Sequence, residues 1–157
     1  MKFKIYILFS LVIFSCDSNV EFLKYNSVNG VWHKDSLQEF SFELNETNEY
    51  NTFVNLRINE EYKFSNIFLI TTLKDSLNIL SKDTLQFKLA DKSGKFIGKK
   101  RINLVDNKLL HKKQLKFEGN KKYFLSIEHA MRVINKVGGL ENLQGVTDIG
   151  YKIEKIN

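Results

Sequence analysis

The sequence contains no proline and only one cysteine among its 157 residues. One cysteine excludes an internal disulfide and any zinc site built from several thiolates. The longest uncharged apolar run covers residues 5–14, about half of the ~20 residues that a membrane-spanning helix needs, which excludes a multi-span membrane protein. What the chain does contain is 43% hydrophobic residues, a composition typical of one folded domain and not of a disordered segment.

Arginine is also scarce. The net charge is +6, but Arg57, Arg101 and Arg132 are the only arginines among 24 basic residues. Recognition of phosphates and bases favours the bidentate guanidinium group, and the lysines here are scattered among acidic residues. We interpret the charge as a solvated surface and expect no nucleic-acid partner.

The N-terminus has the layout of a bacterial secretory signal. Lys2 and Lys4 precede the apolar run 5–14, and Ser15 supplies a small residue directly before Cys16. The five residues that end at this cysteine, Val-Ile-Phe-Ser-Cys, resemble a relaxed lipobox. We predict that Cys16 is lipidated; the alternatives are a plain signal peptide and a buried core cysteine.

This interpretation divides the chain into three segments. Residues 1–15 form the signal peptide, residues 16–24 a lipidated polar tether, and residues 25–157 the folded domain. The two or three acyl chains of a lipoprotein give stable membrane attachment, whereas a single chain anchors only marginally. We therefore expect a protein of the cell envelope that is attached to a membrane through its N-terminal lipid.

The rest of the sequence alternates between apolar and polar residues with a period of two, which is typical of half-buried strands. The alternating segments are residues 39–44, 54–58, 84–89, 115–117, 125–127 and 149–153, and residues 67–73, apolar on both faces, predict a central strand. Turn signals occur at Asn29-Gly30, Ser93-Gly94, Gly119-Asn120 and Gly138-Gly139. We predict an all-β fold, a single antiparallel β-sandwich of the immunoglobulin-like or jelly-roll-like type, in which residues 130–144 form a short helix or a long loop.

A catalytic or metal site is not indicated. Glu128 and His129 are neighbours in a predicted strand and point to opposite faces, so we do not expect them to bind one metal. His129 continues the apolar face of Leu125 and Ile127, which favours a partly buried histidine with satisfied hydrogen bonds. The sequence has no nucleophile elbow, P-loop or zinc-protease motif. We predict a non-catalytic protein that needs no cofactor and no metal.

Two kinds of binding residue remain. Aromatic residues near predicted turns favour an alternative function, a lipid-anchored carbohydrate-binding module; they are Trp32, Tyr50, Tyr62, Phe96 and Tyr123. The polar residues Glu128, Arg132 and Asp148 flank or lie in the segment without alternation. We expect this set either to contact a partner or to brace the loop through an internal ion pair.

Several segments, in their order and spacing, resemble a known family. They are the lipoprotein start and residues 66–73, 82–85, 89–94, 127–132 and 145–155. Together they resemble the gliding motility lipoprotein GldH family of Bacteroidetes. The resemblance implies an outer-membrane-associated lipoprotein of the gliding machinery, which is intertwined with type IX secretion. It implies protein partners from that machinery and no enzymatic activity.

Overall fold

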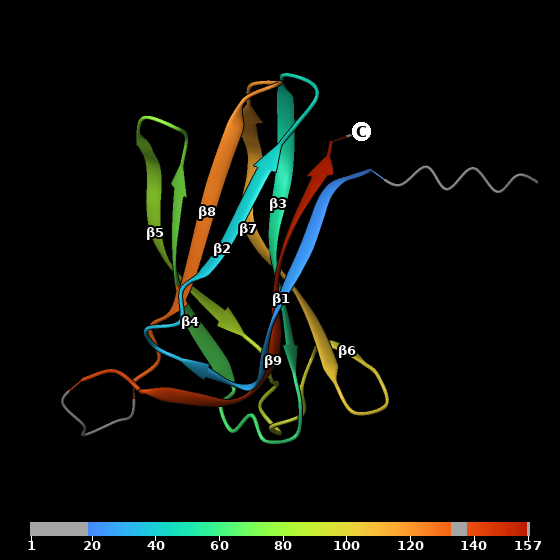
Figure 1. The fold of residues 1–157 in the computed structure, drawn as a ribbon. Helices are drawn as coiled ribbons and strands as arrows, with labels where there is room; N and C mark the ends of the chain where they lie inside the picture. The colour runs from blue at the N-terminus through green and yellow to red at the C-terminus, as the bar shows by residue number, and fades with distance from the viewer. Residues whose placement is uncertain (1–18, 133–137, 157) are drawn as a thin grey trace, which may run out of the picture.

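The computed structural model describes residues 19–132 and 138–156, and these residues form two antiparallel sheets packed face to face (Figure 1). The five-stranded sheet has the order β1-β9-β3-β7-β6, formed by β1 (Val20–His33), β9 (Asn142–Lys155), β3 (Asn48–Ile58), β7 (Val105–Phe117) and β6 (Lys99–Lys100). The four-stranded sheet has the order β2-β8-β4-β5, formed by β2 (Gln38–Glu43), β8 (Lys122–His129), β4 (Asn66–Lys74) and β5 (Ile79–Lys88). The predicted all-β sandwich is confirmed.

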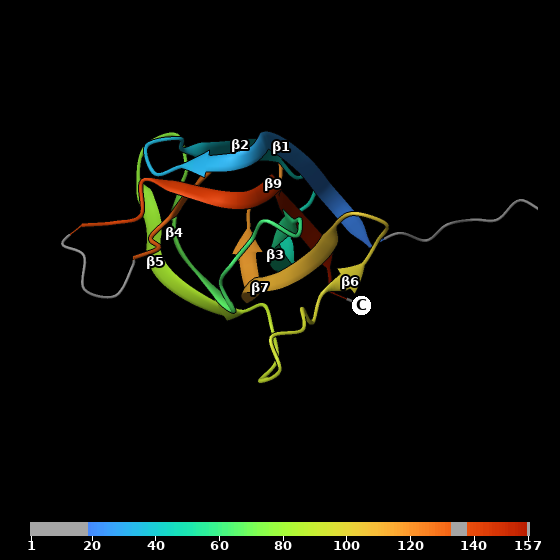
Figure 2. The same ribbon diagram turned by 90° about the horizontal axis from the view of Figure 1, so that it is seen from below.

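The order of the strands is that of a jelly roll. β1 pairs with β9, β2 with β8, β3 with β7 and β4 with β5, as in one long antiparallel ribbon that has been folded over. The folded ribbon closes through the pairs β3–β9 and β4–β8, so strands that follow one another mostly lie in opposite sheets (Figure 2). Of the two predicted sandwich types, the topology is therefore the jelly roll, with β6 as a short added edge strand.

The core lies between the sheets, where the inward side chains of both meet. Strand β2 alternates buried and exposed residues along its whole length, with Phe40 and Phe42 inward. Leu56, Leu69 and Ile127 are fully buried, as their alternation predicted. The segment that is apolar on both faces is β4, and it lies between β8 and β5 as expected for a central strand. Among the described residues, no helix is present that has the length and apolar character to span a membrane.

Strand β1 differs from the prediction in two ways. It begins at Val20, which pairs with Glu154 of β9, so the predicted domain boundary at residue 25 lies inside a strand. Asn29 and Gly30, predicted as a turn, form a bulge within β1: their φ angles are 55° and 87°, and the register with β9 shifts at this point. Residues with positive φ suit both turns and bulges, and here the pairing with β9 continues on both sides.

One buried polar side chain connects the two sheets. His111 of β7 is within hydrogen-bond distance of Thr52 (3.1 Å) and Tyr151 (3.3 Å) through Nδ1, and of Thr71 (3.2 Å) through Nε2. Thr71 belongs to the four-stranded sheet and the other partners to the five-stranded sheet. Burial lowers the pKa of His111 to about 4, because the charged imidazolium would lose its hydration. The imidazole therefore holds the sheets together in its neutral form.

Candidate functional site

The aromatic residues considered for sugar stacking are part of the core. Trp32, Tyr50, Tyr62 and Tyr123 are buried, and Phe96 is packed against the core cluster. The buried polar atoms of these rings bond to the backbone: Trp32 Nε1 donates to Ser36 O at 2.8 Å, and the Tyr62 hydroxyl to Asn66 O at 2.7 Å. The alternative function, a carbohydrate-binding module, finds no support in these rings, because four of them are buried in the core and Phe96 packs against it.

His129 lies at the end of β8 and is more deeply buried than predicted, and its Nδ1 has no hydrogen-bond partner among the described residues. Its Nε2 lies 3.1 Å from the backbone oxygen of Trp32, and its ring meets the Trp32 indole edge-on at 5.3 Å. Burial lowers the pKa of His129, although the hydrogen bond to Trp32 opposes this effect. Residues 19–132 and 138–156 contain no group of three or more His, Cys, Asp or Glu side chains placed to hold a metal ion.

Glu128 and Arg132 lie in the same region, at one end of the sandwich. They line a shallow pocket of about 290 Å³, together with Lys34, Asp35, Ile70, His129, Ala130, Met131, Gly139 and Leu140. Arg132 is exposed and forms no ion pair with any described residue. The residues on either side of the undescribed segment 133–137 are drawn together, because Leu140 N donates to Met131 O at 2.7 Å. We call this site the loop pocket.

Asp148 lies elsewhere. It belongs to β9, where it pairs with Ser27 of β1 and Arg57 of β3, and it points outward from the five-stranded sheet. Its carboxylate accepts a hydrogen bond from the Thr147 hydroxyl at 2.9 Å. Glu128 points outward from the other sheet, since its neighbours Ile127 and His129 are buried. The predicted polar set therefore divides between two sites.

The outward side of the five-stranded sheet forms a second candidate surface, which we call the basic face. Its side chains lie in three cross-strand rows: first Leu23, Lys152, Phe53 and Leu110; next Tyr25, Gly150, Asn55 and Lys108; then Ser27, Asp148, Arg57, Asp106 and Lys99. Lys100, the last residue of β6, and Arg101, which follows it, lie next to the third row. This surface therefore carries six basic residues and three acidic ones, which are Asp106, Asp148 and Glu154.

The ring of Tyr25 packs across the middle of the basic face and contacts its neighbours there. A Cβ atom on Gly150 would lie only 2.7 Å from Cδ1 and Cε1 of this ring, so the absence of a side chain at Gly150 lets the ring cross β9. Asn55 Nδ2 donates to the Tyr25 hydroxyl at 3.0 Å, and the Arg57 guanidinium lies 4.0 Å from the ring centroid. These contacts fix Arg57 over an aromatic ring instead of leaving it in bulk water.

Two of the three carboxylates of the basic face, Asp106 and Glu154, are each neutralised by a pair of cations. Arg57 Nε donates to Asp106 at 3.0 Å, and Arg101 donates to the other oxygen of the same carboxylate. Burial acts to raise the pKa of Asp106, but the hydrogen bonds from the two arginines outweigh it and hold the pKa below its usual value. Glu154 is paired in the same way by Lys108, at 2.7 Å, and by Lys152. The face therefore keeps an excess of positive charge.

Sequence reasoning did not find this surface. Alternation correctly placed Arg57 outward, but its neighbours Tyr25 and Asp106 come from strands that are far apart in the sequence. Two of the three arginines in a lysine-rich chain converge on one aspartate. The sequence contains one signal of this surface, which is the rarity of arginine. In a lysine-rich chain, an arginine marks a position where a planar, bidentate cation is needed and lysine would not serve.

The protein is a small jelly-roll domain, and its candidate sites, the loop pocket and the basic face, are suited to contact with other molecules. The chain belongs to the GldH lipoprotein family, whose model matches residues 20–153. A relative from Flavobacterium johnsoniae, the gliding motility lipoprotein GldH, is 39% identical over 152 residues, which are 96% of this chain and 94% of the relative. A GldH homolog from Christiangramia forsetii is 37% identical over 150 residues, 94% of this chain and 92% of that protein.

Solved structures show only a distant likeness. The crystal structure of dimeric latent PorU from Porphyromonas gingivalis aligns with 85% of this chain and 12% of its own length, at 8% identity and a TM-score of 0.35. The infectious bursal disease virus VP2 particle gives a TM-score of 0.34 at 10% identity, over 85% of this chain and 33% of that one.

Proposed function

We propose that this chain is a non-catalytic lipoprotein of the gliding motility machinery, anchored by lipid in the outer membrane and acting with proteins linked to type IX secretion. The observation that supports this most is the family match over nearly the whole domain, together with relatives of the same length that are named gliding motility lipoproteins. The loop pocket and the basic face are surfaces for contact, as a component of an assembly requires.

The anchor is assigned to Cys16, which lies outside the described residues. Only two residues separate it from Asn19, where the described chain begins, and β1 begins at Val20. The lipid would therefore be attached almost directly to an edge strand of the sandwich. This short connection supports the proposal that the domain works close to the membrane surface.

Replacing Cys16 with alanine is expected to release the protein from membranes without unfolding it. The core of the described domain is formed by other residues, while each acyl methylene buried in the bilayer stabilises attachment by ~0.8 kcal/mol. The measurement is membrane fractionation combined with urea unfolding of the released protein. Ser18→Ala, a neighbouring change that keeps the thiol, serves as the control. A Cys16→Ala protein that still sediments with membranes would contradict the lipid anchor.

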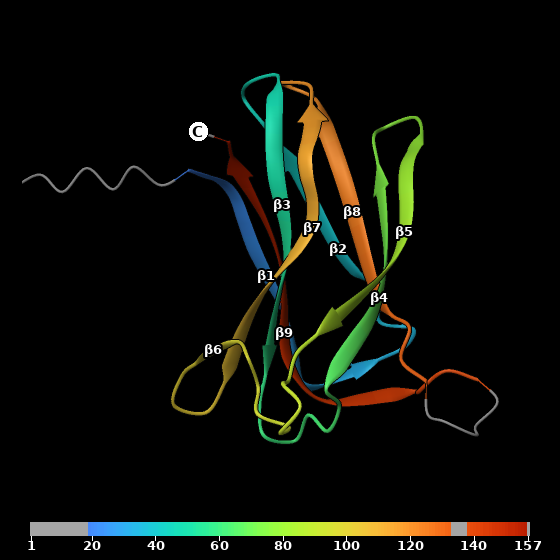
Figure 3. The ribbon, with the colours of Figure 1, turned by 180° about the vertical axis from the view of Figure 1, so that it is seen from behind.

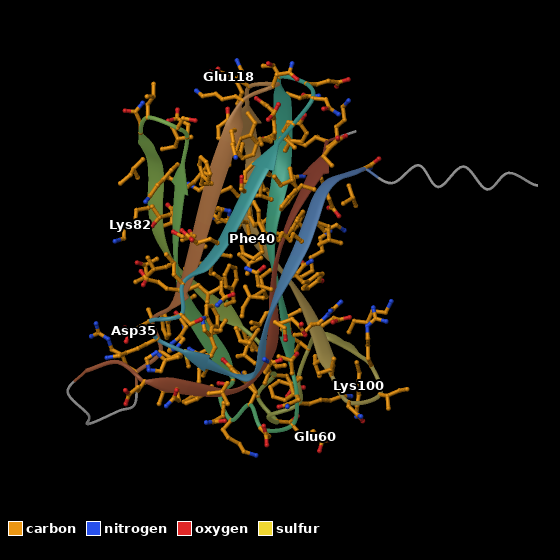
Figure 4. The ribbon with its side chains drawn as sticks, viewed as in Figure 1. Asp35, Phe40, Glu60, Lys82, Lys100 and Glu118 are labelled. Atoms are coloured by element: carbon orange, nitrogen blue, oxygen red, sulfur yellow. The ribbon has the colours of Figure 1, made fainter. Side chains whose placement is uncertain are left out.

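The partner site is assigned to the loop pocket. Arg132 is exposed there without a described ion-pair partner, and Glu128 supplies a carboxylate on the same rim. A guanidinium that is not used inside a fold is available for a bidentate contact with a carboxylate of another protein. The pocket also lies away from the start of β1: Figure 4 places Asp35, on the pocket rim, on the opposite side of the molecule from the first residues of that strand.

Arg132→Ala is expected to leave the free energy of unfolding within about 0.5 kcal/mol of the wild type, but to weaken crosslinked complexes and spreading on agar. Lys82→Ala removes a cation from the exposed face of β5 and serves as the matched control. The measurements are urea unfolding and co-purification after crosslinking in native membranes. If Arg132→Ala forms wild-type complexes, the loop pocket is not the partner site; if it lowers stability instead, the arginine braces the loop.

A further inference from the structure

The hairpin between β6 and β7 ends in an apolar residue that none of the described residues covers. Arg101 N donates to Leu104 O at 2.8 Å and closes the turn, and Ile102 at its tip is 96% exposed. The three residues before it, Lys99, Lys100 and Arg101, are all basic and exposed. An isolated apolar tip behind a row of cations is the composition of segments that enter the interface of an anionic bilayer. We call residues 99–104 the basic hairpin.

The basic hairpin lies on the side of the molecule from which the anchor would leave. Figures 1, 2 and 3 agree that β6 and the start of β1 project to the same side, whereas the residues around the loop pocket project to the other. β1 and β6 are the two edges of the five-stranded sheet. From Cys16 to Asn19 the backbone spans at most ~11 Å. A lipid at Cys16 therefore holds the bilayer near the side that carries the hairpin.

The surface between these two edges suits the same contact. The first row of the basic face exposes Leu23 (49%) and Leu110 (39%), with Lys152 between them across the sheet. Lys108 and Lys152 neutralise Glu154, and Arg57 and Arg101 neutralise Asp106, so no bare carboxylate in these two clusters faces an approaching phosphate. Basic groups near an anionic membrane strengthen binding about fivefold each.

We propose that the basic hairpin is a second membrane contact: Ile102 inserts into the interfacial region of an anionic phospholipid bilayer, and Lys99, Lys100 and Arg101 bind its phosphate groups. The inference rests on the proposed lipid anchor, which supplies the high local concentration that a single isoleucine and three cations need. Docking at both edges lays the five-stranded sheet against the membrane. It leaves the loop pocket pointing away from the bilayer, where a protein partner can reach it.

The test places an environment-sensitive fluorophore at the tip. Acylation consumes the chain's one native thiol, so Ile102→Cys in the mature, lipidated protein provides a unique labelling site. The protein is reconstituted in vesicles of phosphatidylglycerol and phosphatidylcholine, or of phosphatidylcholine alone. Leu77→Cys is the matched control: Leu77 is 89% exposed at the turn between β4 and β5, without an adjacent cation.

We expect blue-shifted emission and quenching by lipid-borne nitroxides at position 102 in the phosphatidylglycerol vesicles, and emission typical of water at position 77. Neutralising the hairpin with Lys99→Gln, Lys100→Gln and Arg101→Gln should abolish the shift at 102 while the protein still floats with the vesicles. Raising the ionic strength from about 0.1 M to about 1 M shortens the Debye length from ~10 Å to ~3 Å and should reduce the shift.

Flotation separates the two hypotheses. A protein that does not float with vesicles has no lipid anchor, and the inference falls with it. A protein that floats while position 102 remains in water keeps the anchor and overturns the membrane contact alone. Burial of position 102 in native membranes but not in protein-free vesicles would mean that a protein covers the hairpin, which also overturns the inference.

Discussion

Gly145→Ala is expected to lower the free energy of unfolding by about 3 kcal/mol or more. Gly145 of β9 has a φ of 83°, and a Cβ atom there would lie 2.1 Å from Tyr62 N and 2.5 Å from Tyr62 Cα. Both obstructing atoms belong to the backbone, so no side-chain rotation relieves the overlap. The carbonyl of Gly145 also accepts a hydrogen bond from Asn59 N at 2.9 Å, which holds the two segments together.

A second glycine separates the two causes of this loss of stability, which are the strain of a positive φ and the overlap with the backbone of Tyr62. Gly94 has nearly the same φ, 85°, but nothing lies within 4 Å of its Cβ position. Gly94→Ala should therefore cost only the backbone strain, about 1 kcal/mol. Urea unfolding followed by circular dichroism gives both values. Equal losses of unfolding free energy in the two variants would contradict this prediction. They would show that the backbone at Tyr62 moves at little cost to make room for a Cβ atom at position 145.

The strands were predictable where one face of the chain is buried and the other is wet. Segments 39–44, 54–58 and 149–153 alternate because the core takes every second side chain, and all of their residues lie in strands except Leu44, which directly follows β2. No part of strand β1 was predicted, because it is an edge strand that exposes several residues on both faces. Its Asn29 and Gly30 adopt positive φ as predicted, but local conformation alone does not distinguish a bulge from a turn.

The candidate sites depend on register, which the sequence does not specify for strands far apart in the chain. Asp148 and Arg132 were grouped because they flank the same segment, yet the folded ribbon sends β8 and β9 into opposite sheets. The same folding brings Tyr25, Arg57 and Asp106 together across the basic face. Sequence reasoning identified rare arginines as notable but had no way to pair them.

Acidification is expected to destabilise the domain through His111, beginning at a pH at which carboxylates are still ionised. Its imidazole is neutral in the fold, with a pKa lowered to about 4 by burial and, secondarily, by the charge of Lys112; the charge of Asp83 opposes the shift. The unfolded chain binds the proton near the ordinary pKa of 6.5. The stabilisation is therefore complete above about pH 6.5 and is lost as the pH falls toward 4, by about 3 kcal/mol in all.

His111→Gln isolates this contribution, because glutamine keeps hydrogen-bonding groups in the core but does not titrate. The variant should be less stable than the wild type at about pH 7, since the contacts to Thr52, Thr71 and Tyr151 are disturbed, and should lose less stability than the wild type on acidification to about pH 4.5. His129, whose pKa is also lowered, leaves a residual slope in both proteins. Urea unfolding at the two pH values measures the difference. Parallel slopes would mean that His111 accepts its proton inside the fold, with Asp83 close enough to compensate the buried charge.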